Sequence, residues 1–276
     1  MNQNIMQKKI PSSNYADMLT VAEWELSSDA IDKLNLLNSC PELLKEARKF
    51  REEYEKSPKN FPEGRLLQLK QTMFEVRFAI AINRTKYSVE NKYKTGVDGT
   101  DVDFKLTDTE QEWLIELTNP ITSQQVKDNT KILENGLQEY QSITSDQHNA
   151  PEVTDIIKIQ KVIFSKVSNE ECKPIKFPLI STSKAYHIIV VSMNSFNGSI
   201  SDKDDYTNIV YGSKALSNSF HQRLWYDSEK KESEMIKGVF DEIHVNPQAK
   251  TQAKILQERV HAICFIKEKF EEKKVE

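Results

Sequence analysis

The chain has 276 residues, of which 38% are hydrophobic and 29% are charged, a balance typical of a folded protein with a polar surface. No apolar run approaches the roughly 18 residues that a membrane span needs, and the N-terminus lacks an apolar core of signal-peptide length. The 7 glycines are few, which argues against a glycine-rich phosphate loop. We therefore expect a globular protein with no membrane partner.

The cysteines and the charge narrow the class of protein further. Cys40, Cys172 and Cys264 lie far apart and form no CxxC pair, so a structural zinc site is not expected and a reducing, cytoplasmic setting fits best. The formal net charge is −4, which weighs against extended contact with nucleic acid. The 38 Lys and Arg residues still allow the fold to assemble a local basic groove.

The first 60 residues predict an N-terminal helical segment. Ser27–Asp29 can cap a short helix that runs to about Asn38, and Pro41 opens a second helix that is charged on most faces. We assign residues 1–60 to this segment and residues 61–276 to one α/β core.

The helix predicted from Glu63 to about Asn83 differs from the two before it. Its second half, MFEVRFAIAI, is apolar nearly all round apart from Glu75 and Arg77. A helix of this kind is normally buried against a sheet.

Strand patterns follow this helix. Residues 87–91 form a short strand, GVDG at 96–99 forms a turn, and DVDFKL (101–106) and WLIELT (113–118) alternate in the manner of a hairpin. Beyond the hairpin we predict helices at about 122–143 and 152–168, strands at 185–193, 239–245 and 260–266, and a polar loop at 194–210. This order of elements predicts an α/β fold with a mixed central β-sheet flanked by helices.

Three acidic side chains lie in otherwise apolar elements. Glu116 shares its strand face with Leu114 and Thr118, where a carboxylate is costly unless it has a partner. The hairpin would bring Asp103 close to Glu116, and a divalent cation would relieve the repulsion between them. Glu75 shares its helix face with apolar residues, which draws it towards the interior. Oxygen ligands of this kind suit Mg²⁺ or Mn²⁺.

These acids carry a resemblance to a known superfamily. A helix Glu, then a strand Asp, then E-x-K in the next strand is the pattern of the PD-(D/E)xK nucleases, and FEVRF, DVDF and IELT resemble it over roughly residues 63–170. The resemblance implies a restriction-endonuclease-like core and phosphodiester hydrolysis by water that a metal ion activates. Carried over by position, Glu75, Asp103 and Glu116 would be the metal-binding carboxylates.

Two positions depart from the pattern. Val102 replaces the usual Pro, which matters little for chemistry, but Thr118 occupies the Lys position and has no positive charge. In some branches of the superfamily this Lys has moved onto a nearby helix. The helix IIKIQKVIFSK offers Lys166 on its inward face as the first candidate and Lys161 as the second. Thr118 and Lys166 complete the catalytic set that the resemblance implies.

Simpler interpretations stay open for the same residues. Glu116 could pair with Lys105, and Glu75 could pair with Arg84. Asp101 could take the role assigned to Asp103, because it shares the same strand face. Lys166, near a helix end, could be a solvated surface residue. The five histidines show no metal-ligand spacing and are expected to be structural or exposed.

The sequence thus predicts an Mg²⁺- or Mn²⁺-dependent endonuclease or exonuclease, with DNA expected ahead of RNA as its partner and prokaryotic or mobile-element defence as its setting. The alternative is a catalytically inactive nuclease-like fold that binds protein or nucleic acid. The missing strand Lys and the acidic net charge favour this alternative. The N-terminal helices are candidates for a homodimer contact or for contact with a protein partner or target.

Overall fold

The computed structural model describes residues 21–37, 40–58, 61–122, 130–132, 138–140, 151–196, 200, 203–217, 237–240 and 246–268. The helices among them are α1 (Val21–Leu37), α2 (Pro41–Lys56), α3 (Glu63–Asn83), α5 (Pro151–Ser165), the 3₁₀ turn η3 (Ile180–Thr182), α6 (Lys203–Ser217) and α7 (Pro247–Arg259). The strands are β1 (Ser88–Lys94), β2 (Asp101–Thr107), β3 (Glu112–Thr118), β4 (Thr130–Ile132), β5 (Gln138–Tyr140), β6 (Ala185–Ser192) and β7 (Ala262–Ile266).

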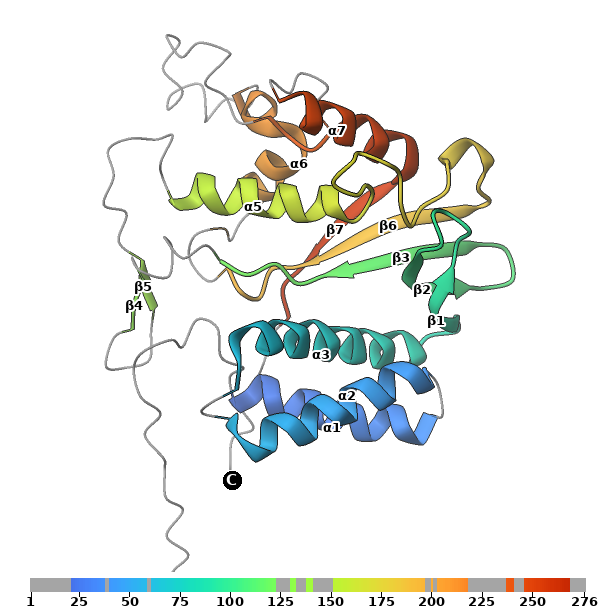
Figure 1. The fold of residues 1–276 in the computed structure, drawn as a ribbon, viewed down its shortest axis with the longest axis vertical. Coiled ribbons are helices and arrows are strands. Elements are labelled where there is room, and N and C mark those ends of the chain that lie inside the picture. Colours follow the sequence, from blue (N-terminus) through green and yellow to red (C-terminus); the bar gives the residue numbers. More distant parts are fainter. Residues whose placement is uncertain are drawn as a thin grey trace, which may run out of the picture.

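A mixed sheet of five strands, in the order β1-β2-β3-β6-β7, forms the centre of the fold. The first three strands are antiparallel, whereas β6 runs parallel to β3 and β7 runs parallel to β6. Helix α3, with α1 and α2 behind it, covers one face of the sheet, and α5, α6 and α7 lie on the other (Figure 1). The predicted α/β class, mixed sheet and N-terminal helices are confirmed.

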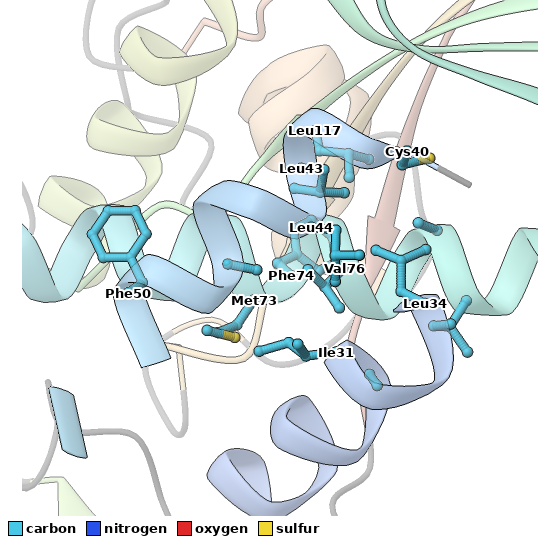
Figure 2. Close-up of a cluster of buried hydrophobic side chains, with 14 of the residues drawn as sticks. Ile31, Leu34, Cys40, Leu43, Leu44, Phe50, Met73, Phe74, Val76 and Leu117 are labelled. Atoms are coloured by element: carbon cyan, nitrogen blue, oxygen red, sulfur yellow. The ribbon is translucent and has the colours of Figure 1, made fainter. Parts of the chain in front are cut away.

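The alternation of side chains along β3 divides the core into two hydrophobic clusters. Ile115 and Leu117 belong to the cluster on the α3 side, and Leu114 belongs to the cluster on the α5 side. Figure 2 shows Leu117 in one cluster with residues of α2 and α3, including Leu43 and Met73. Each such fully buried side chain stabilises the fold by about 1.5–3 kcal/mol. The apolar second half of α3 is therefore held between the sheet and the N-terminal helices.

The N-terminal helix begins earlier than the capping pattern predicts. Helix α1 starts at Val21, so Ser27 lies inside it, and its hydroxyl donates a hydrogen bond to the Glu23 carbonyl at 2.7 Å. A serine within a helix can satisfy its hydroxyl with the carbonyl one turn back, which removes it from the capping role.

Three predictions in the second half are wrong or lie outside the described residues. The helix predicted at 122–143 is contradicted by the paired strands β4 and β5, and its other residues after Thr122 lie outside the described ranges. The loop predicted at 194–210 contains the start of α6, whose first turn carries Asp204 and Asp205. Acidic residues there favour a helix start through the helix dipole, although the stretch is polar. Of the strand predicted at 239–245, the first two residues form a turn and the rest is not described.

None of the helices in the described part of the chain is long and apolar enough to cross a membrane.

Candidate active site

The β2–β3 hairpin positions the first acid. The ladder pairs Thr107 with Glu112 and continues to Phe104 with Ile115, and Asp103 is the next residue of β2. Its Oδ2 accepts a hydrogen bond of 2.8 Å from the backbone N–H of Leu117. The carboxylate thus takes an acceptor position that a strand carbonyl normally fills, which fixes it between the two strands.

Glu116 lies in β3, with only 1% of its side chain exposed. Its Oε1 accepts hydrogen bonds from the ammonium groups of Lys166 at 2.8 Å and Lys176 at 2.7 Å. Lys166 directly follows the last residue of α5, and Lys176 comes from the segment between α5 and β6. The other oxygen, Glu116 Oε2, is buried and has no hydrogen-bond partner among the described residues.

Glu75 approaches the hairpin from α3. Its Oε1 accepts a hydrogen bond of 2.9 Å from Gln71, one helical turn earlier, and Gln71 also donates to the carbonyl of Leu117 at 3.3 Å. The ammonium of Lys92 in β1 lies 3.4 Å from Glu75 Oε2 and 2.9 Å from Asp103 Oδ1. Lys92 therefore joins the helix acid to the hairpin acid.

The three acids form one electrostatic system. Burial, reinforced by the negative charge of Asp103, raises the pKa of Glu75 to about 7, although Lys92 and Gln71 oppose this shift. The same two causes raise the pKa of Glu116 above its usual range. Burial alone lowers the pKa of Lys166, but the charges of Glu116 and Asp103 outweigh it, so the pKa lies above its ordinary value. The buried carboxylates are thus balanced by lysines that keep part of their surface in solvent.

Of the other residues predicted for the site, Thr118 and Lys166 lie close to Glu116 and Lys161 does not. Thr118 is buried at the end of β3, two residues after Glu116, where it pairs with Val191 of β6. Of the two lysines considered on the helix, Lys166 lies beside Glu116, whereas Lys161 is exposed and lines a groove between α5 and α7.

Lys105 and Asp101, which the simpler interpretations place at the site, have other partners in the structure. Lys105 pairs with Glu112 at 2.9 Å rather than with Glu116. Asp101 pairs with Lys94 at 2.9 Å on the exposed side of the hairpin. Asp103 and Glu116 are therefore the buried acids of β2 and β3.

Sequence reasoning missed Gln71, Lys92 and Lys176. The spacing of Gln71, four residues before Glu75 on one helix, is a signal that was present in the sequence. A hairpin centred on GVDG also places Lys92 opposite Asp103, because its neighbours pair Asn91 with Phe104 and Tyr93 with Val102. No comparable signal marks Lys176, which belongs to no helix or strand.

The donor chemistry and the geometry of the three acids decide whether they could bind a metal ion. Among the described residues, no group of three or more His, Cys, Asp or Glu side chains is arranged to hold a metal ion. Mg²⁺, however, is commonly bound through one or two carboxylates and keeps several waters. Asp103 and Glu116 fit that smaller donor set, and the buried Glu116 Oε2 is an oxygen still free to accept a ligand bond.

No known family model, no curated protein and no solved structure matches this chain. The functional argument therefore rests on the residues and geometry of the acidic site.

Proposed function

We propose that this protein is a metal-dependent nuclease that hydrolyses phosphodiester bonds on a restriction-endonuclease-like core. The observation that carries the proposal is the ammonium of Lys166 at 2.8 Å from Glu116, beside the acid pair of the hairpin. The lysine charge that Thr118 cannot supply is thus available from the end of α5. The preference for DNA over RNA as substrate rests on the resemblance of the acidic motifs to those of restriction endonucleases.

Each residue has a role in this reaction. Asp103 and Glu116 would hold the Mg²⁺ or Mn²⁺ ion, which supplies Lewis-acid stabilisation of the phosphate and activation of water. Lys166 would stabilise the negative charge that develops on the phosphate or the nucleophile. Glu75 would bind a second ion or orient the attacking water, and Thr118 would hydrogen-bond to a ligand or to water.

The test is cleavage of plasmid and single-stranded DNA and of RNA, with Mg²⁺, Mn²⁺ or EDTA. Glu116→Gln preserves the shape of the side chain and is expected to abolish metal-dependent cleavage. The matched control is Glu112→Gln, a partly exposed acid on the same strand that pairs with Lys105. Lys166→Met is expected to lower the rate by about 10²-fold or more, as loss of one transition-state donor does, whereas Lys161→Met in the adjoining helix α5 should cleave normally. Cleavage that survives Glu116→Gln would contradict the proposal.

A second candidate is a catalytically inactive relative of this fold that serves as a binding module for protein or nucleic acid. The observation that favours it is the hydrogen bonding of the acids: every carboxylate oxygen of Glu75, Asp103 and Glu116 except Glu116 Oε2 already has a donor within the described residues. Purified protein that shows no cleavage in any metal, and no change in melting temperature on adding Mn²⁺, would exclude the nuclease and leave this candidate.

A further inference from the structure

Lys92 occupies a position that differs from those of the other two lysines. Lys166 and Lys176 both bind one oxygen of one acid, Glu116. Lys92 instead contacts two acids from two elements, at 2.9 Å from Asp103 and 3.4 Å from Glu75. A cation between two buried carboxylates is the arrangement that a divalent ion would otherwise provide.

The backbone at Lys92 is also unusual. Its φ of 55° lies in the left-handed region, although the residue is inside strand β1 and is not a glycine. Such a conformation costs of order 1–3 kcal/mol and persists only where the surroundings enforce it. The neighbouring pairs Asn91–Phe104 and Tyr93–Val102 are in register, so the strained residue is the one that lies across from Asp103.

Lys92 is also more exposed to solvent than the two acids that it contacts. Strand β1 is an edge strand, and 39% of the Lys92 side chain is exposed. Glu75 and Asp103 are each only 7% exposed and have no such freedom. Because the Lys side chain is flexible, its ammonium group can rotate out into the solvent when another cation takes its place.

We propose that Lys92 is an internal cation that holds Glu75 and Asp103 together in the metal-free protein and competes with a divalent ion for Asp103. This inference rests on the proposed function, because it concerns the affinity of the same site for its metal. Lys92 is a positioning residue that sets the metal concentration at which the site fills, and it makes no contact with the substrate in this scheme.

The experiment is titration of Mn²⁺ into EDTA-treated, dialysed protein without nucleic acid, followed by calorimetry. Lys92→Met removes the charge and is expected to bind Mn²⁺ about tenfold more tightly than the unmodified protein, because one like charge near the ion is lost from a partly solvated site. Lys92→Arg keeps the charge and should restore the original affinity. The matched control is Lys94→Met, since Lys94 lies on the same strand and pairs with Asp101 at the same 2.9 Å.

The possible outcomes separate this inference from the proposed function. Tighter Mn²⁺ binding by Lys92→Met, reversed in Lys92→Arg and absent in Lys94→Met, supports the internal cation. Unchanged or weaker binding by a folded Lys92→Met overturns it while leaving the nuclease proposal standing. Binding of Mn²⁺ by neither protein overturns both. Lys92→Gln is a second neutral variant should the Met variant melt below the assay temperature in EDTA.

Discussion

At the scale of single residues, His187 shows how burial selects a protonation state. The ring is fully buried in β6, with Nδ1 2.7 Å from the carbonyl of Arg259 and Nε2 2.8 Å from the hydroxyl of Ser183. A carbonyl only accepts, so Nδ1 carries the proton and Nε2 accepts from the serine. Burial lowers the pKa of His187; the hydrogen bond to the Arg259 carbonyl opposes this shift, and the nearby charges of His261 and Arg259 reinforce it.

We expect His187 to contribute stability that falls as the pH drops. The folded-state pKa lies below the unfolded value, so the unfolded state binds the proton more readily. The stabilisation is complete above about pH 6.5, the unfolded pKa, and is lost as the pH falls through the folded pKa. His187→Gln should be less stable at pH 7.5, and its deficit should shrink towards pH 5. Urea unfolding in EDTA at several pH values measures this, and the exposed Glu46→Ala in α2, far from the ring, is the control. A deficit that stays constant with pH would contradict the prediction.

Residues of the candidate site could be predicted from the sequence where short-range patterns, such as strand alternation, determine their positions. Asp103 and Glu116 follow from two-residue alternation in a hairpin, and the register around the turn also contains the position of Lys92. Lys176 could not be predicted, because it depends on the path of a segment outside the regular elements and has a φ of 64°. The sequence alone does not decide whether the acids bind a metal ion. In the structure three lysines, Lys92, Lys166 and Lys176, balance their charge.

At the scale of elements, one buried arginine connects the two ends of the described chain. Arg77 of α3 makes two hydrogen bonds to the carboxylate of Glu268, of 2.8 and 2.7 Å, and a third of 2.7 Å to the hydroxyl of Ser27 in α1. Asn194 donates to the same Glu268 carboxylate at 2.7 Å. A planar guanidinium suits this bidentate contact with the carboxylate, and a lysine cannot reproduce it.

We predict that breaking this contact destabilises the protein markedly. Glu268→Gln and Arg77→Met should each lower the free energy of unfolding by about 2–5 kcal/mol, because a buried charge loses its partner. The double variant should cost less than the sum of the two, since both changes remove the same Arg77–Glu268 interaction, although Glu23, 3.6 Å from Arg77, also loses that contact. Urea unfolding provides the measurement. Arg51→Ala, which breaks an exposed pair with Asp32, is the control and should cost less than about 1 kcal/mol. Additive losses in the double variant would show that the two groups do not act together.

Element boundaries were predicted well where the hydrophobic pattern is strong and poorly where it is weak. Helix α3 matches its predicted bounds, because its long apolar run meets the sheet on one side and α1 and α2 on the other. Helix α1 starts before the predicted cap, and the hydroxyl of Ser27 instead bonds the Glu23 carbonyl inside the helix and the guanidinium of Arg77. The paired strands β4 and β5 have three residues each, which is too short for two-residue periodicity to register.

At the scale of the whole molecule, the sheet and the N-terminal helices share one hydrophobic cluster. The cluster contains Leu34 of α1, Leu43 of α2, Met73 of α3 and Leu117 of β3 (Figure 2). These residues come from both sides of the boundary predicted between residues 60 and 61. Helix α3 also carries Glu75, so the N-terminal helices help to hold one of the three acids in place.

Such a shared cluster predicts that the N-terminal helices and the sheet unfold in one transition. Trp24 in α1 packs on Tyr54 with ring centroids 4.6 Å apart, and Trp113 in β3 packs on Tyr87 at 5.0 Å. Because the chain also contains Trp225, the Trp24→Phe/Trp225→Phe and Trp113→Phe/Trp225→Phe variants each leave one fluorescent tryptophan, on opposite sides of α3. We expect both to follow the same urea midpoint as circular dichroism, which is the mark of two-state unfolding.

Leu43→Ala should shift all three curves together by about 2–5 kcal/mol, the cost of emptying a buried leucine site. The exposed Glu46→Ala on the same helix is the control. If the transition seen through Trp24 separates from that seen through Trp113, the N-terminal helices are an independent unit, and a core beginning at residue 61 should then fold alone.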